Sequence, residues 1–300
     1  MKNQHASSGF DAPKEIGIGN LKQASDLGEF EYNYISNLMH DVTGVFLDKH
    51  KIPMIQVRLA RRIADLKLDG FRSYISYLRS HEEEKEHLIN SLTTHKTDFF
   101  REPEHFEYLT KVVLPYIVQN DHQKKLRVWS AASSSGEEAY TLAIVLKEFF
   151  DSAPEISGWD YKILGTDIDT SVVAKASNGV YSSEVVRTIR PDLVQKYFQR
   201  GTGKNSGLYK VSPEISQIVK FRTHNLLEDL SDFGDLRFHV TFLRNVLIYF
   251  KDETREIVIK RMWQSLKPHG YLFVGHSEPL QGIDHQFKNV KASIYLKERV

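Results

Sequence analysis

The first part of the chain has apolar residues at helical spacing. Between Phe30 and about Ser91 they recur every three or four positions, as in Ile55, Leu59 and Ile63. This period places the apolar side chains on one face of a helix and predicts a small helical bundle over residues 29–91. The polar run HEEEKEH that begins at residue 81 is typical of a solvated helix face near a domain boundary.

From residue 125 onward, apolar runs typical of strands alternate with helical patterns. Examples of the strand-like runs are LRVWSAA, YKILGTDID, FHVTFL and GYLFVGHSE. This alternation predicts an α/β domain over residues 92–300 with a mostly parallel sheet. The C-terminal run KNVKASIYLKE predicts a closing antiparallel strand.

The βα alternation breaks between about residues 181 and 222. Short β-like segments at 196–203 and 208–218 flank the turn GTGKNSG, which predicts an inserted antiparallel β-subdomain. The GxG of this turn precedes a strand and not a helix, which argues against a phosphate-binding loop.

Composition narrows the possible functions. The 300 residues carry a formal net charge of +1, which gives no bulk preference for nucleic acid. Cysteine is absent, which excludes disulfides, thiolate metal sites and cysteine nucleophiles, and the histidines lack HExxH spacing, so no metal is expected. Residues 1–28 are polar and lack an apolar signal-peptide core. We therefore expect a disordered tail, a cytoplasmic location and no membrane insertion.

The segment VWSAASSSGEEAYT, residues 128–141, joins a buried-strand pattern to a turn of small residues and a helix start. Small residues let a ligand approach the backbone, and the first N–H groups of the helix point at the same place. The adjacent acids Glu137 and Glu138 disfavour a phosphate and favour a cationic cofactor or a ribose diol. The alternative is an ordinary βα turn with acids in the first helical turn.

The second predicted strand ends in GTDID, residues 165–169. In doubly wound folds an acid at this place accepts hydrogen bonds from a ribose diol, which makes Asp167 the candidate ligand. Asp169 is better placed to cap the next helix. The preceding turn lacks the three-glycine dinucleotide fingerprint, which favours a smaller adenosyl cofactor over NAD.

Another apolar strand, in FLRNVLIYF, is interrupted at its carboxyl end by Arg244 and Asn245 and is followed by Tyr249. Ligands bind at such strand ends. A buried arginine needs a carboxylate partner, which either the substrate or an internal salt bridge would supply. Upstream, the linker THKTDFFR places polar groups and an arginine around the pair Phe99 and Phe100. This segment would fold over a bound cofactor; the alternative is that the two aromatics dock the linker on the core.

Six blocks, THKTDFFRE, WSAASSSGEEAYTLA, GTDIDTSVVAKASNGVY, HNLLE, FLRNVLIYF and GHSE, resemble in order and spacing the CheR-type chemoreceptor glutamate O-methyltransferases. The resemblance spans residue 30 to the C-terminus. It implies an N-terminal helical domain followed by a class I S-adenosylmethionine methyltransferase domain, Rossmann-like, with a small β-subdomain. The implied cofactor-binding residues are His95, Thr97, Arg101, Glu138, Asp167, Asn225, Leu226, Arg244 and Asn245.

The resemblance further implies that Tyr249 faces the reacting methyl group. We hypothesise that Arg244 and Tyr249 orient the incoming glutamate, while Asp167 holds the cofactor diol and Arg101 its amino acid end. His95 stands where the family usually has asparagine, and the resemblance implies a hydrogen bond from this position to the methionine moiety of the cofactor.

Arg58, Arg61 and Arg62 share helical spacing and would attract glutamate-rich chemoreceptor helices. A solvated basic face or a phosphate-binding patch is the alternative. In the family the β-subdomain can also dock a receptor tail by strand addition.

Other possible functions are a methyltransferase for a small molecule or nucleic acid and a cofactor-binding adaptor without turnover.

Overall fold

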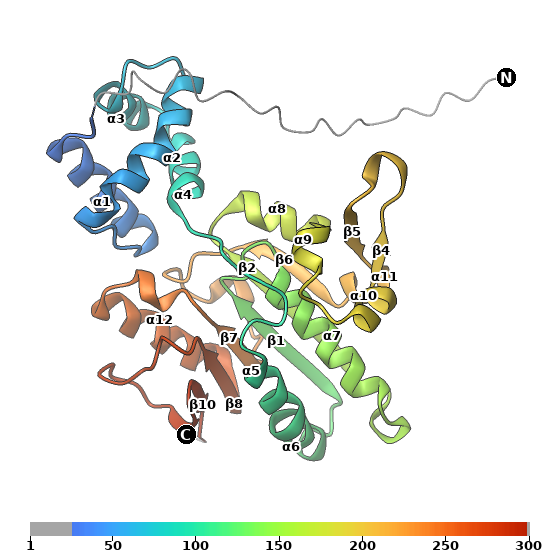
Figure 1. Cartoon of the computed structure of the whole chain (residues 1–300). Helices are drawn as coiled ribbons and strands as arrows, with labels where there is room; N and C mark the ends of the chain where they lie inside the picture. Colours follow the sequence, from blue (N-terminus) through green and yellow to red (C-terminus); the bar gives the residue numbers. More distant parts are fainter. Residues whose placement is uncertain (1–25, 299–300) are drawn as a thin grey trace.

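In the computed structural model, which describes residues 26–298, a helical unit precedes a larger unit built on a seven-stranded sheet (Figure 1). Up to residue 25, the predicted tail lies outside the described residues. Leu27, in contrast, belongs to the core of the helical unit and is 8% exposed. The predicted tail therefore extends too far at its C-terminal end, because this leucine has an apolar surface to bury.

The predicted helical bundle is present. Its elements are α1 (Glu29–Thr43), η2 (Lys49–Lys51), α2 (Ile52–Asp65), α3 (Phe71–Ser80) and α4 (Glu84–Leu92). Ile55, Leu59 and Ile63, which share one face of α2, are each at most 3% exposed and pack in the core of the unit. No described helix has the length and apolar character that crossing a membrane requires.

The large sheet is mixed, with the order β6-β2-β1-β7-β8-β10-β9. Its strands are β1 (Lys125–Ala131), β2 (Asp160–Asp167), β6 (Val219–Thr223), β7 (Phe238–Leu243), β8 (Leu266–Val274), β9 (Lys288–Lys291) and β10 (Ile294–Leu296). The first five in this order are parallel, and β10 runs antiparallel to β8. The single closing strand predicted at the C-terminus is two short strands, because the chain turns at Ser293, whose φ is 60°.

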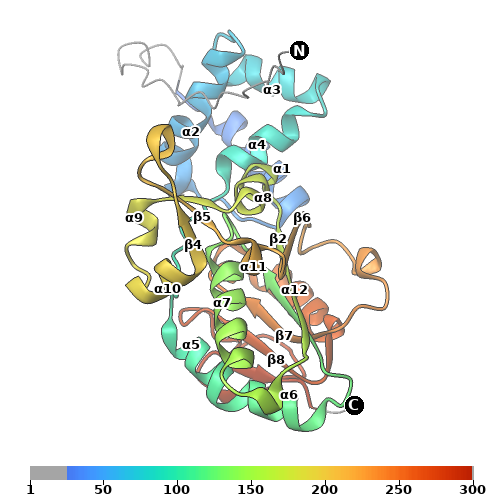
Figure 2. The ribbon, with the colours of Figure 1, turned by 90° about the vertical axis from the view of Figure 1, so that its right-hand side faces the viewer.

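Alternating side chains of the central strands enter two cores. Val128 and Phe242 face one core, while their neighbours Trp129 and Leu243 face the other. The first core includes α5 (Pro103–Tyr108), η3 (Leu109–Val113), α6 (Leu114–Asn120) and α7 (Glu137–Asp151), and the second includes α12 (Asp252–Ser265). Helices thus cover both faces of the sheet, as Figure 2 shows for α7 and α12. α8 (Thr170–Asn178) contacts β2 and β6, and the short helices η4 (Pro154–Ile156) and η6 (Ser231–Phe233) lie in connections.

The insertion forms a separate three-stranded antiparallel sheet of order β3-β5-β4. Its elements are β3 (Val180–Ser182), α9 (Ser183–Val186), α10 (Pro191–Tyr197), β4 (Phe198–Arg200), η5 (Gly203–Asn205), β5 (Leu208–Val211) and α11 (Pro213–Ser216). The hairpin strands are shorter than predicted, because prolines at 191 and 213 begin helical turns beside them. The predicted boundary at 222 is also too late, since residues 219–223 pair with β2 in the large sheet.

Candidate active site

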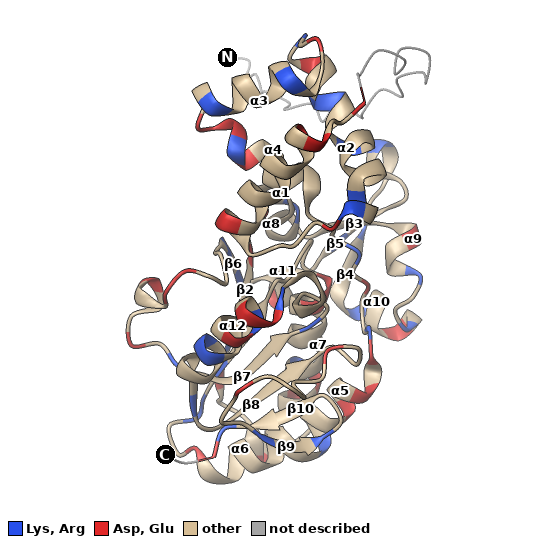
Figure 3. Cartoon of the chain, turned by 90° about the vertical axis from the view of Figure 1, so that its left-hand side faces the viewer, with Lys and Arg blue, Asp and Glu red and all other residues tan. Residues whose placement is uncertain are grey.

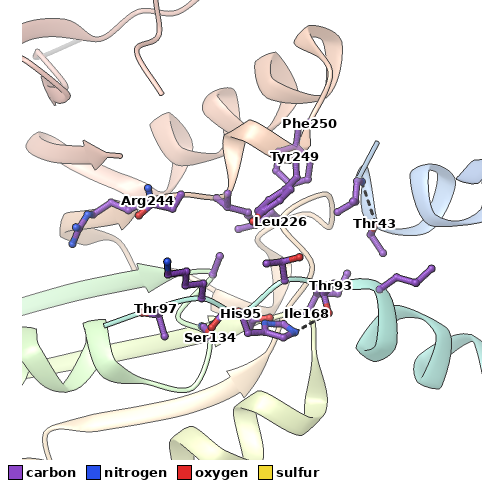
Figure 4. Close-up of a pocket in the computed structure, with 18 of the residues that line it drawn as sticks. Thr43, Thr93, His95, Thr97, Ser134, Ile168, Leu226, Arg244, Tyr249 and Phe250 are labelled. Carbon is purple, nitrogen blue, oxygen red and sulfur yellow. Dashed lines mark hydrogen bonds between the residues drawn. The ribbon is translucent and has the colours of Figure 1, made fainter. Parts of the chain in front are cut away.

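A pocket lies at the carboxyl ends of β1, β2 and β7, between the sheet and the helical unit. It is lined by all ten residues that the sequence predicts to bind cofactor or to act in catalysis: His95, Thr97, Arg101, Glu138, Asp167, Asn225, Leu226, Arg244, Asn245 and Tyr249. Figure 4 shows Leu226 and Tyr249 facing His95 and Thr97 across the pocket. The fold therefore brings together residues from five separate segments of the chain.

The turn between β1 and α7 forms one wall of this pocket. The Ser133 N–H donates to the Thr166 carbonyl at 2.7 Å, and the Ser134 N–H donates to Asp167 Oδ2 at 2.8 Å. Gly136 has a φ of +98°, and a Cβ there would lie 2.9 Å from the Ala176 Cβ. The positive φ and the lack of space for a Cβ both require glycine at this position. The hydrogen bonds of Ser133 and Ser134 hold the turn close to the end of β2.

The two acids after β2 have different environments. Asp167 is 7% exposed, lines the pocket and accepts hydrogen bonds only from the N–H groups of Ser134 and Asp169. Burial raises its pKa. Asp169 accepts from the N–H groups of Ser171 and Val172 at the start of α8. The predicted helix cap is thereby confirmed, whereas the pocket-lining carboxylate of Asp167 remains available to a ligand.

His95 is positioned by Asp169. Its Nε2 lies 2.7 Å from Asp169 Oδ2 and 2.8 Å from Thr93 Oγ1, and its side chain is 23% exposed. Burial raises the pKa of Asp169, but hydrogen bonds from His95 and Ser171 outweigh this and bring the pKa to about 2. This His95 nitrogen is thus engaged within the protein, and a contact of His95 to the cofactor stays a prediction.

Both predicted roles of the linker aromatics are compatible with the structure. Phe99 is 3% exposed and packs edge-on against Tyr181 and Phe198 of the β-subdomain, while Phe100 packs against Phe106. The aromatics thereby dock the linker on the core. The neighbouring residues Thr97 and Arg101 consequently face the pocket.

Arg244 forms an internal network at the end of β7. Its Nε donates to Glu102 Oε2 at 3.2 Å, Nη1 donates to Glu138 Oε2 at 3.2 Å, and Nη2 donates to the Arg101 carbonyl at 2.5 Å. The side chain is only 2% exposed. Figure 4 shows it extending away from Tyr249. Arg244 therefore forms the internal salt bridge that the sequence analysis gave as an alternative. All three nitrogens of its guanidinium already donate hydrogen bonds within the protein.

The two carboxylates of this network have pKa values shifted in opposite directions. Burial raises the pKa of Glu138 more than Arg244 and Ser130 lower it. Burial also acts to raise the pKa of Glu102, but Arg244 and the His276 N–H shift it below its usual value. Glu138, which lines the pocket, is thus the acid whose pKa is raised.

The helical unit supplies part of the pocket that the sequence did not indicate. Thr43, Val45, Phe46, Leu47, Lys51 and Met54 line it. Asn225 Nδ2 donates to the Val42 carbonyl at 2.7 Å, and the Phe46 N–H donates to the Tyr249 carbonyl at 2.8 Å. No sequence motif marks these contacts, because they depend on how the two units pack.

Glu102, His105 and His276 are the one group of potential metal ligands among residues 26–298, with ligand atoms within 4.8 Å of one another. The buried His105 Nδ1 has no hydrogen-bond partner. However, Glu102 already pairs with Arg244, so a divalent ion would lie beside a guanidinium cation. The arrangement fits the ion pair better than a metal site.

The three arginines of α2 do not form a common free basic stripe. Arg62 donates to Glu84 through Nε at 2.9 Å and Nη2 at 2.6 Å, and Arg58 Nη1 donates to the Leu92 and Thr93 carbonyls at the end of α4. Arg61 has a 79% exposed side chain, and its Nε lies 4.0 Å from Asp65 Oδ2 one helical turn away. The prediction of three available guanidinium groups is therefore corrected. Helical spacing within α2 does not show the hydrogen-bond acceptors that α4 and its C-terminal end place beside Arg58 and Arg62.

The strand order with an antiparallel β10, the turn after β1 and the acid after β2 define a class I S-adenosylmethionine-dependent methyltransferase fold. The pocket fits this cofactor. The Gly136 turn permits close approach of the backbone, Asp167 offers acceptor oxygens to a diol, and the carboxylates suit a cationic sulfonium.

The chain belongs to the CheR methyltransferase family. The model of the family's S-adenosylmethionine-binding domain matches residues 95–296, and that of its all-alpha domain matches residues 31–93. A chemotaxis protein methyltransferase of Salmonella typhimurium is 37% identical over 279 residues, which cover 92% of each chain. The Escherichia coli relative of the same name is 38% identical, covering 90% of this chain and 91% of its own. Chemotaxis protein methyltransferase 2 of Pseudomonas aeruginosa is 37% identical, covering 88% and 92%.

Proposed function

We propose that this protein transfers the methyl group of S-adenosylmethionine to glutamate side chains on the cytoplasmic helices of chemoreceptors. The reaction would form glutamyl methyl esters for chemosensory adaptation, in the cytoplasm. The observation that carries the proposal is the convergence of all ten predicted residues on one pocket. The relatives named chemotaxis protein methyltransferases, which match nearly the whole chain, support the chemotactic role.

The chemistry requires positioning more than proton transfer. S-adenosylmethionine supplies a methyl group activated by a sulfonium. A glutamate oxygen forms the bond to the methyl carbon as the carbon–sulfur bond breaks, and the electron pair stays on sulfur. Because the glutamate is already ionised at neutral pH, no general base is needed. Holding the two reactants at near-attack distance supplies about 7–11 kcal/mol of the barrier.

The pocket residues have distinct proposed roles. Asp167 accepts hydrogen bonds from the ribose diol, Arg101 holds the carboxylate of the cofactor, and Tyr249 faces the reacting methyl group. Arg244 acts indirectly, since its guanidinium fixes Glu138 and the linker carbonyl of Arg101. This assignment replaces a direct contact between Arg244 and the incoming glutamate.

Receptor recognition would take place outside the pocket. Figure 3 shows basic and acidic positions interspersed over both units, in keeping with the net charge of +1. Arg61, exposed on α2, is the arginine of this helix best placed to meet an acidic receptor helix. The short strands of the β-subdomain are proposed to dock a receptor C-terminal tail by strand addition. Calorimetry with receptor tail peptides tests this step, and absence of binding would count against it.

The decisive experiment measures transfer of labelled methyl from S-adenosylmethionine to receptor-containing membranes, followed by release of methanol in base. Volatile, base-released label is the expected result, and Asp167→Asn is the matched variant that should lose cofactor affinity. Base-stable label would overturn the glutamate assignment and favour a nitrogen or carbon acceptor. No label, despite cofactor binding and a suitable receptor, would favour an adaptor without turnover.

A further inference from the structure

The motif GHSE after β8 has no role in the pocket described above, yet its glutamate lies beside it. Glu278 is 1% exposed. Its Oε2 accepts hydrogen bonds from the Asn245 N–H at 2.5 Å and the Gly275 N–H at 2.9 Å, and its Oε1 accepts from the Ile248 N–H at 3.1 Å. A buried carboxylate is thus held by backbone N–H groups in place of a basic partner.

These hydrogen bonds fix the segment that carries the predicted catalytic tyrosine. Asn245, Val246 and Tyr249 line the pocket, and Asn245 has a φ of +59°, a conformation that few non-glycine residues adopt. On its other side, the segment accepts a hydrogen bond from the Phe46 N–H through the Tyr249 carbonyl. Glu278 is therefore the anchor of this segment within the sheet unit, and Phe46 is its anchor in the helical unit.

The packing around Glu278 leaves little room for the segment to move. A Cβ on Gly275 would lie 2.5 Å from Glu278 Oε2 and 2.8 Å from Asn245 Nδ2. The absence of a side chain at Gly275 thus lets β8 and the segment after β7 approach the same carboxylate. The motif supplies both the glycine and the acceptor.

We infer that Glu278 is a positioning residue for methyl transfer, which holds residues 245–248 so that Asn245 and Tyr249 face the cofactor pocket. This inference rests on the proposed function. Both carboxylate oxygens are used as acceptors. Glutamine has the same shape but offers one oxygen and an NH₂ group, which cannot accept. Glu278→Gln therefore leaves at least one of the N–H groups without an acceptor.

The test compares Glu278→Gln with Asp121→Asn in the full-length chain. Asp121 pairs with His239 and Lys267 at the opposite end of β7 and β8, away from the pocket. For Glu278→Gln, we expect kcat for receptor methylation to fall about 100-fold, since small displacements near reacting groups have effects of this size. The Kd for S-adenosylhomocysteine should rise less than about tenfold, because the Asp167 side of the pocket is intact.

A second measurement does not depend on activity. Hydrogen exchange of the Asn245 and Ile248 amides should accelerate in Glu278→Gln. In Asp121→Asn, the free energy of unfolding should fall, but exchange of these two amides should not accelerate. Unchanged kcat and unchanged exchange would overturn the inference. Loss of the folded state in both Glu278→Gln and Glu278→Asp would also overturn the inference, because Glu278 would then be required for folding of the whole protein. If wild-type protein methylates no receptor glutamate, the proposed function fails, while the exchange result still reports on the anchor.

Discussion

Two arginine–carboxylate networks, one in each unit, are built from the same chemistry and differ in their setting. The Arg62 side chain is 27% exposed and that of Arg244 is 2% exposed. In the helical unit, Arg62 pairs with Glu84, whose carboxylate also accepts a hydrogen bond from the Tyr74 hydroxyl. In the sheet unit, Arg244 pairs with both Glu102 and Glu138. The first network has one carboxylate for one guanidinium, and the second has two. The second network therefore places two carboxylates around one guanidinium, beside the pocket that would hold a cationic sulfonium.

The difference shows that a buried ion pair does not mark a functional site by itself. The Arg62 network joins α2, α3 and α4 and borders no part of the pocket, whereas Arg244 and Glu138 line it. Buried pairs contribute little net stability but are costly to break. What distinguishes the network at the pocket is its second carboxylate and its position at the carboxyl ends of the strands.

The largest expected effect comes from Arg244→Ala. The substitution leaves Glu102 and Glu138, whose side chains are 14% and 13% exposed, without their cation, so the free energy of unfolding should fall by about 3–5 kcal/mol. Turnover should be lost, with some cofactor binding retained. Urea denaturation and receptor methylation measure the two effects, and Arg244→Lys, which keeps the charge but not the forked geometry, is the control. Unchanged turnover would remove Arg244 from the site.

A smaller effect, confined to stability, is expected for Glu84→Gln. The side chain of Glu84 is 1% exposed, and the substitution weakens its hydrogen bonds with Arg62 and Tyr74. The free energy of unfolding should fall by about 1–3 kcal/mol. Affinity for S-adenosylhomocysteine, measured by calorimetry, should not change. A lower affinity would mean that the two networks are coupled and that the Arg62 network also affects the pocket.

The smallest effect is a difference in pH dependence. Burial raises the pKa of Glu84, but hydrogen bonds from Arg62 and Tyr74 lower it below its usual value. Its contribution to stability is therefore present above about pH 4.5 and is lost as the pH falls through its folded-state pKa. Burial raises the pKa of Glu138, so its contribution is present below about pH 4.5 and is lost as the pH rises through its folded-state value.

The stability difference between wild type and Glu84→Gln should consequently shrink on acidification, while that between wild type and Glu138→Gln should change in the opposite direction. Urea denaturation between about pH 3 and pH 7 compares the two series, since carboxyl groups titrate in this range. Parallel slopes would show that both carboxylates have the same environment.

Local patterns were sufficient to predict much of the fold and of the pocket. Helical spacing gave the bundle, strand-like runs gave the large sheet, and the acid after a strand gave Asp167. Glu102 and Glu278 were not assigned roles, although both lie in the motifs that were recognised. Their importance depends on partners far along the chain: Arg244 lies 142 residues from Glu102, and Asn245 lies 33 residues from Glu278.

The sequence by itself determined the order of elements, through periodicity, and the family resemblance, through motifs a few residues long. That resemblance implied most of the residues that meet at the strand ends. Only the tertiary structure decided which partners the charges have. It paired Arg58, Arg62 and Arg244 with groups of other elements and left Arg61 exposed beside Asp65. The physical reason is that a charged group selects its partner through distance and burial, which depend on how separate elements pack.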